Sequence, residues 1–178
     1  MELVQRDLIE PVLAFLRLHA TWAPLILFGV MLLEGIIVTT FLFSGFVLGL
    51  AAGALIQGGV LAFMPVFLAI FFGFWVGDTI NFIIGQKGEN WFRNLAVMRS
   101  RAAMLAKAEA LIQKWGGAAI FVSRFMGPIR PFVTFLAGTF HMPQAVFHGA
   151  TILSTLLLTG GLLNAGMTGA QLWMQWAK

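Results

Sequence analysis

Hydrophobic positions along the chain fall into two long blocks separated by a polar, basic stretch. The first block covers residues 23–84 and the second covers residues 118–167, and each is almost continuously apolar. Within these blocks, residues 60–84 and residues 144–163 are each long enough for one membrane-spanning helix, which needs about 20 apolar residues. The pattern therefore predicts two full transmembrane helices, each preceded by shorter apolar segments.

The segment before the first predicted span is rich in glycine. It reads FSGFVLGLAAGALIQGG, and this spacing of glycines is typical of a bent or re-entrant element that packs against other protein. The segment before the second span, SRFMGPIRPFVTFLAG, contains Gly127, Pro128 and Pro131. Since proline lacks a backbone donor and interrupts a continuous helix, we expect two half-helices there, with a break from Gly127 to Pro131.

The two blocks also resemble each other. Ala52-Gly53 and Ala137-Gly138 are each followed by a short connector and then by an apolar helix. If each unit crosses the bilayer once, the second unit enters from the opposite side, as in transporters built from inverted repeats. The predicted fold is therefore an all-α integral membrane protein with two inverted repeats, 23–86 and 117–167, each a re-entrant helical hairpin followed by a transmembrane helix.

The remaining segments predict interfacial and surface elements around this single membrane domain of residues 23–178. Residues 1–22 are predicted as an amphipathic interfacial helix, and residues 168–178, which end in two tryptophans and a lysine, as an interfacial tail. Residues 87–116 contain six of the eleven lysines and arginines, and a helix within them should end at Gly116. The positive-inside rule makes this linker cytoplasmic.

Composition supports a membrane protein and excludes several functions. Hydrophobic residues make up 60% of the chain and charged residues only 10%, against about 25% in soluble domains. The absence of cysteine removes thiolate metal sites, and a net charge of +4 is too sparse for a nucleic-acid partner. His141 and His148 lack the four-residue spacing of a helical metal pair, so we expect interfacial residues, no metal and no cofactor.

Two arginines, Arg124 and Arg130, flank the predicted break in an otherwise apolar segment. An arginine at the centre of a membrane helix costs at least about 2.5–3.5 kcal/mol, so each needs a compensating role. A break that turned both side chains toward one cavity would form a strong phosphate site. The alternative is structural: both arginines extend to the interface, or they pair with Glu34 and Asp78.

Glu34 and Asp78 are the candidate proton-carrying acids. Glu34 lies in the strongly apolar stretch ILFGVMLLEGIIV, where a carboxylate is a candidate for proton coupling or a structural counter-ion for an arginine. Asp78 lies toward the end of its predicted span, which favours a helix-end carboxylate in contact with water or the basic linker over a midplane site. Both stay candidates for proton coupling.

Residues 25–165 resemble the DedA family, also called the VTT-domain family. The most specific match is SRFMGPIRPFVTFLAGTFHMP, whose Arg124, Pro128, Arg130 and Ala137-Gly138 follow the family pattern. GDTINFIIGQKG and LLEGIIVTTFLFSGFVLGLAAGAL resemble two further family segments. One departure is Phe46, which stands where the family carries a second acid in its first hairpin.

The resemblance implies a bacterial inner-membrane protein with several spans that moves a phosphate-bearing lipid, undecaprenyl phosphate or a phospholipid, between leaflets. Its partners would be anionic lipid headgroups, and both proton coupling and a homodimer stay open. The alternatives are an energy-independent scramblase, a non-transporting scaffold and an intramembrane lipid phosphatase. The phosphatase needs a nucleophilic histidine and a base histidine held by a carboxylate. It is disfavoured because His141 and His148 have no acid nearby in sequence, so we expect no enzyme.

Overall fold

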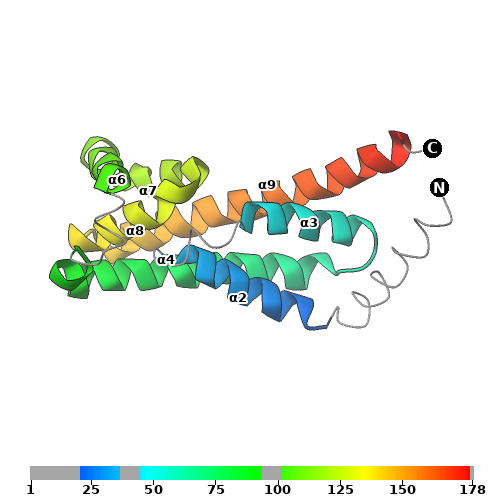
Figure 1. Ribbon diagram of the computed structural model, residues 1–178, viewed down its shortest axis with the longest axis horizontal. Coiled ribbons are helices and arrows are strands. Elements are labelled where there is room, and N and C mark those ends of the chain that lie inside the picture. Colours follow the sequence, from blue (N-terminus) through cyan, green and yellow to red (C-terminus); the bar gives the residue numbers. More distant parts are fainter. Residues whose placement is uncertain (1–20, 37–44, 94–101, 177–178) are drawn as a thin grey trace.

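The computed structural model describes residues 21–36, 45–93 and 102–176, and these ranges contain helices and turns but no strand. The predicted interfacial helix of residues 1–22 lies almost wholly outside them. In the described ranges the helices are α2 (Ala23–Gly35), α3 (Gly45–Gln57), α4 (Phe63–Arg93), α6 (Ala102–Trp115), α7 (Ala118–Ser123), the 3-10 helix η1 (Arg124–Ile129), α8 (Arg130–Thr139) and α9 (Gln144–Trp176). Figure 1 shows them as an elongated bundle.

Two long helices, α4 and α9, form the length of the bundle, and the colours of Figure 1 show that they run in opposite directions. Each contains a segment long and apolar enough to cross a membrane, Phe63–Lys87 and Gln144–Trp176. Both predicted spans are therefore confirmed as helices of sufficient length. Helix α9 continues to Trp176, so residues 168–176 of the predicted interfacial tail belong to the same helix as the second predicted span.

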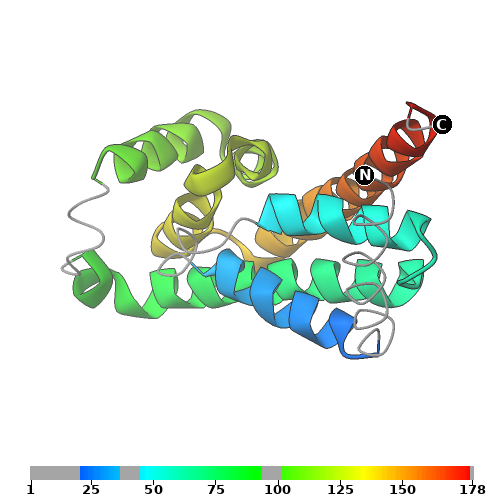
Figure 2. The ribbon, with the colours of Figure 1, turned by 45° about the vertical axis from the view of Figure 1, so that its right-hand side comes forward.

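The shorter helices pack on the long ones in a regular way. Helices α2 and α8 pack on α4, whereas α3 and α7 pack on α9 (Figure 2). Each long helix is thus covered by one short helix from its own half of the chain and one from the other half. This exchange ties the two halves into a single bundle.

The crossing of α8 over α4 depends on two glycines. A Cβ atom added to Gly138 would collide with the backbone carbonyl of Phe82, and one added to Gly85 would collide with the carbonyl of Phe135. Since glycine has no side chain, the two backbones approach more closely than any other residue would allow. The predicted Ala-Gly step therefore holds α8 directly against α4.

The crossing of α3 over α9 is built in the same way. A Cβ atom on Gly53 would collide with the carbonyl of Leu163, and one on Gly166 would collide with the carbonyl of Leu50. In both crossings the short helix contributes a carbonyl three residues before its glycine, and so does the long helix. The two crossings therefore share the same pattern of close contacts between glycines and backbone carbonyls.

Buried apolar side chains form two clusters along the bundle. One gathers around α8 and includes Phe82, Phe132 and Phe147, and the other joins α2, α3 and α9 to α4 and includes Phe74. Helix α6 covers the first cluster with its buried face and leaves its lysines exposed, and it ends before Gly116, whose φ is +53°, as predicted. Along α4, Phe74 and Phe82 bracket the middle of the helix, where the polar site lies.

Candidate functional site

The predicted break in the second half is a change of helix type rather than an open kink. The chain leaves α-helical geometry at Arg124, continues as the 3-10 helix η1, and resumes as α8 at Arg130. The change thus begins before Gly127, and Pro128 lies within η1. Pro131 lies in the first turn of α8, where its missing N–H would have had no intrahelical partner anyway. Each arginine therefore starts a new helical segment.

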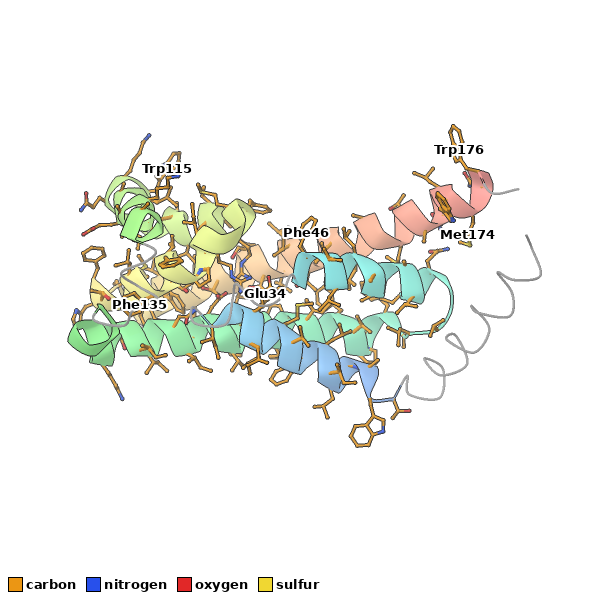
Figure 3. All side chains as sticks on the ribbon, in the orientation of Figure 1. Glu34, Phe46, Trp115, Phe135, Met174 and Trp176 are labelled. Atoms are coloured by element: carbon orange, nitrogen blue, oxygen red, sulfur yellow. The ribbon has the colours of Figure 1, made fainter. Side chains whose placement is uncertain are left out.

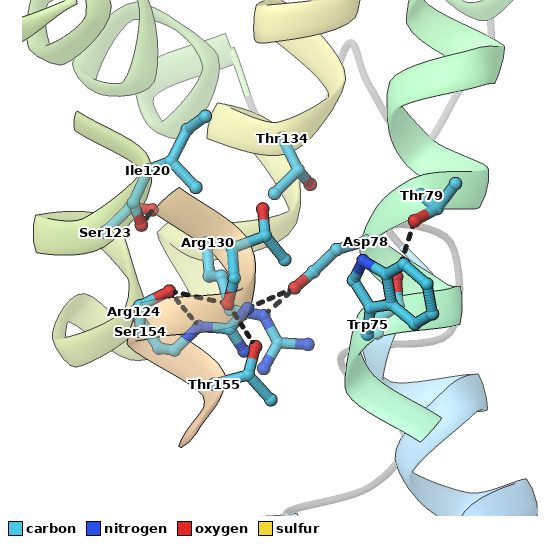
Figure 4. A network of polar contacts seen from close by, with 12 residues as sticks. Trp75, Asp78, Thr79, Ile120, Ser123, Arg124, Arg130, Thr134, Ser154 and Thr155 are labelled. Atoms are coloured by element: carbon cyan, nitrogen blue, oxygen red, sulfur yellow. Dashed lines mark hydrogen bonds and ion pairs between the residues drawn. The ribbon is translucent and has the colours of Figure 1, made fainter. Parts of the chain in front are cut away.

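Both arginines turn inward and meet on one carboxylate. Arg124 Nη2 lies 2.5 Å from Asp78 Oδ2, and Arg130 Nε lies 3.4 Å from Asp78 Oδ1 (Figure 4). Arg124 is 4% exposed, Arg130 6% and Asp78 0%. The interpretation that the arginines extend to the interface is therefore wrong, because both guanidinium groups are inside the bundle.

Asp78 was expected at a helix end in contact with water or the linker, and that expectation is wrong. Helix α4 runs from Phe63 to Arg93, so Asp78 lies at its middle. Its side chain is fully buried and bridges two arginines on the other half of the chain. Such a buried ion pair is weak evidence for stability, because desolvation offsets most of the attraction. A group of this kind is more typical of a functional site.

Helix α9 supplies a neutral contact to the same cluster. Arg124 Nε donates a hydrogen bond to Ser154 Oγ at 3.0 Å, and Ser154 in turn donates to the carbonyl of Ala150 at 2.7 Å. This contact holds Nε of the guanidinium while Nη2 of the same group faces Asp78. Residues of α4, α9 and the η1–α8 region thus meet at one point.

The ring of Phe74 lies beneath both cations. The guanidinium carbon of Arg130 is 4.4 Å from the ring centroid and that of Arg124 is 5.9 Å away. Phe74 lies one helical turn before Asp78 on α4 and is 2% exposed. An aromatic face attracts cations through its quadrupole, so the ring adds a neutral second partner that persists if the carboxylate is neutralised.

We expect Phe74→Leu to lower the free energy of unfolding by more than the loss of apolar area alone would. A desolvated cation–π contact contributes about 2 kcal/mol, which Leu cannot replace although it fills much of the space. Thermal unfolding in detergent measures the effect, with Phe74→Trp as the variant that keeps an aromatic face. If Phe74→Trp lost as much stability as Phe74→Leu, the fit of the phenylalanine side chain, and not its contact with the cations, would determine stability here.

The C-terminal end of α2 lies against Arg130. A Cβ atom on Gly35 would lie 3.6 Å from Arg130 Nη2, and the carbonyl of Gly35 accepts a 2.6 Å hydrogen bond from Asn81 Nδ2. Glu34, the residue before Gly35, is half-buried at this end of α2 (Figure 3). Because a helix C-terminus carries partial negative charge, α2 adds to the negative field around Arg130.

Two guanidinium donors remain available for a ligand. Arg124 Nη1 and Arg130 Nη2 are buried and have no hydrogen-bond partner among the described residues. Buried donors of charged groups are normally satisfied, and guanidinium groups match the oxygens of a phosphate or carboxylate. The arrangement is therefore suited to bind an oxyanion beside Asp78 or in its place.

Of the residues predicted from the sequence, Arg124, Arg130 and Asp78 meet in this cluster, whereas Glu34 lies at the neighbouring end of α2. The sequence analysis did not single out Phe74, Asn81 and Ser154. Asn81 also donates to Thr134 Oγ1 at 3.3 Å and so links α4 to α8. The available signal was the presence of polar residues inside spans that are otherwise apolar, because such residues need a partner. Phe74 gave no comparable signal, since a phenylalanine in an apolar helix is the ordinary case.

In the part of the chain that the structure describes, every regular element is a helix, and two helices are long and apolar enough to span a membrane. These helices meet around buried charges, an arrangement consistent with an all-helical membrane protein. The chain belongs to the VTT-domain family: the VTT domain model matches residues 22–168. The resemblance to the DedA family is thereby confirmed over a range slightly wider than the expected residues 25–165.

Similar curated proteins are bacterial membrane proteins. Protein DedA of Escherichia coli K12 is 33% identical over 144 residues, which is 78% of this chain and 65% of DedA. Inner membrane protein YabI of the same organism is 33% identical over 125 residues, or 70% and 49% of the two chains. An uncharacterized membrane protein of Buchnera aphidicola is 30% identical over 137 residues, or 77% and 54%.

The chain spans about half the length of several of these relatives, since it matches 49% of YabI and 54% of the Buchnera protein. No solved structure matches it. The relatives support a location in a bacterial membrane, and the name of YabI refers to the inner membrane.

Proposed function

We propose that this protein moves a phosphate-bearing lipid between the leaflets of the bacterial inner membrane. Arg124 and Arg130 would bind the headgroup while the lipid tails stay in the bilayer. The observation that supports this proposal is the pair of buried guanidinium groups that share one carboxylate and keep two donors without a partner. A structural ion pair alone gives no reason for a second cation or for unused donors.

The arrangement of the helices favours a transporter made of two inverted repeats. Helices α4 and α9 run in opposite directions, and the glycine crossings of α3 on α9 and of α8 on α4 repeat each other. In this proposal α2 with α3, and α7 with α8, are the re-entrant hairpins, and the linker of residues 87–116 is cytoplasmic. Two related halves that meet at a central charged site provide the geometry for alternating access.

Asp78 is the carboxylate best placed to compete with the headgroup. It contacts both arginines, whereas Glu34 lies at the neighbouring end of α2. When Asp78 takes up a proton, the arginines lose their counter-ion and become available for phosphate. When it releases the proton, it displaces the headgroup. Glu34 remains the second candidate for proton coupling, and Phe46 at the position of the family's second acid leaves that role to these two residues.

The central test is transport by purified protein in liposomes, with fluorescent or radiolabelled lipids assayed by leaflet. We expect Arg124→Gln and Arg130→Gln each to slow the transfer of a phosphate-bearing lipid by more than tenfold, because a neutral amide cannot replace the charged fork that binds phosphate. Lys114→Gln removes an exposed cation of α6 and should transport at the wild-type rate.

Several outcomes of this assay separate the alternatives. Folded arginine variants with unchanged rates would exclude the headgroup site and favour a scaffold. Undecaprenyl phosphate and phospholipids are tested side by side, because both present the same phosphate chemistry. Transport that does not respond to a proton gradient identifies a scramblase, and release of inorganic phosphate identifies a lipid phosphatase. If the gradient drives transport, Asp78→Asn and Glu34→Gln identify which acid couples it.

A further inference from the structure

Helix α9 carries a buried stripe of hydroxyl groups next to the arginine site. Its four members are fully buried and recur at the three- and four-residue spacing of one helix face. They are Thr151, Ser154, Thr155 and Thr159. Ser154 contacts Arg124 directly, so the stripe passes the proposed headgroup site and extends along α9 on both sides of it.

Two hydroxyls of the stripe donate to backbone carbonyls of their own helix, and the other two do not. Ser154 donates to the carbonyl of Ala150, and Thr155 donates to that of Thr151 at 2.6 Å, as buried hydroxyls in apolar helices normally do. The hydroxyls of Thr151 and Thr159 are buried without a hydrogen-bond partner among the described residues. A buried donor without a partner is unfavourable, and valine would fill the same space without that cost. Packing alone therefore does not explain these threonines.

The glycine crossings show which residue of α4 occupies the position that Thr159 occupies on α9. Asp78 lies seven residues before Gly85 on α4, and Thr159 lies seven residues before Gly166 on α9. The two glycines have the same role in the two crossings, because each lies under a carbonyl of a short helix. Thr159 is thus the counterpart of Asp78 in the other half of the bundle, where a neutral hydroxyl replaces the carboxylate.

We infer that Thr159 is a second, weaker contact point for the phosphate headgroup, reached along the hydroxyls of α9 after the headgroup leaves Arg124 and Arg130. This inference rests on the proposed function. Hydroxyls donate to phosphate oxygens without adding charge, so they bind a headgroup briefly and release it. A transport path needs such sites, since a headgroup held only by two arginines would leave slowly. Thr159 is fully buried in this structure, so the headgroup reaches it only when one of the helices packed on α9 moves away.

The test is Thr159→Val, which removes the hydroxyl and keeps the shape. We expect the midpoint of thermal unfolding to stay equal or to rise, because an unsatisfied donor is lost, while the rate of lipid transfer in liposomes falls about tenfold. Thr168→Val is the matched control, because Thr168 lies on the same helix but is exposed. A wild-type transfer rate for Thr159→Val would overturn the inference.

Thr159→Ser separates the hydroxyl from the methyl group. A rate close to wild type for Thr159→Ser supports the inference, and a loss as large as that of Thr159→Val overturns it.

The binding of a short-chain lipid phosphate to protein in detergent reports on the arginine site alone. Thr159→Val should bind this probe as wild type does, whereas Arg124→Gln should not. If Arg124→Gln binds and transports normally, the proposed function fails; if only Thr159→Val behaves as wild type, the second contact point alone fails.

Discussion

Asp78→Asn should lower the free energy of unfolding by about 3–5 kcal/mol, the usual cost of leaving a buried charge without its partner. Asp78 is fully buried and contacts both Arg124 and Arg130, so its neutralisation leaves two neighbouring guanidinium groups without a counter-ion. Their mutual repulsion is strong because the surroundings exclude water. Phe74 and Ser154 hold the cations in part but carry no negative charge to balance them.

Unfolding in detergent, followed by loss of helical signal, measures this effect. Glu109→Gln makes the same chemical change on the surface helix α6 and should shift stability by less than about 0.5 kcal/mol.

Adding Arg124→Met to Asp78→Asn removes one of the two unbalanced cations and should recover part of the stability but no transport. If Asp78→Asn is as stable as wild type, the three charges do not form the coupled group described here. If the double variant is no more stable than Asp78→Asn alone, the loss has another source than uncompensated charge.

Much of the fold followed from length and hydropathy. The two spans were predictable because about 20 apolar residues can satisfy their backbone in a membrane only as a helix. The end of α6 at Gly116 was predictable from glycine's freedom to adopt positive φ. The partners of α3 and α8 were not predictable. A glycine indicates close approach, but only the assembled bundle decides that Gly53 contacts α9 and Gly138 contacts α4.

The two cations of the candidate site could be identified from the sequence, but the position of its anion could not. Arg124 and Arg130 were identified because a permanent charge in an apolar segment needs a reason. Asp78 was placed at a helix end because it precedes the basic linker closely in sequence. That reasoning failed because α4 continues to Arg93 and places Asp78 at its middle. The site therefore depends on how far a helix extends, and local sequence decides this least reliably.

Gly138→Ala should lower the free energy of unfolding by about 3 kcal/mol, the upper end for an overpacked site, since the new methyl meets backbone and not a movable side chain. The added Cβ would collide with the carbonyl of Phe82, so α8 must move away from α4. Arg130 begins α8 and Asp78 lies one turn before Phe82, so the same movement separates the ion pair. We expect lipid transfer to fall with stability.

Two further alanine variants isolate the cause. Gly161→Ala has open space around the new methyl and should stabilise α9 by about 0.5–1 kcal/mol, because alanine restricts the unfolded chain. Gly53→Ala introduces the equivalent collision at the crossing of α3 and α9, so its stability loss should match that of Gly138→Ala. If the two crossings are copies with the same role, neither half can be loosened without loss of transport. A Gly53→Ala protein as stable as wild type would instead show that only the crossing next to Arg130 holds the bundle together.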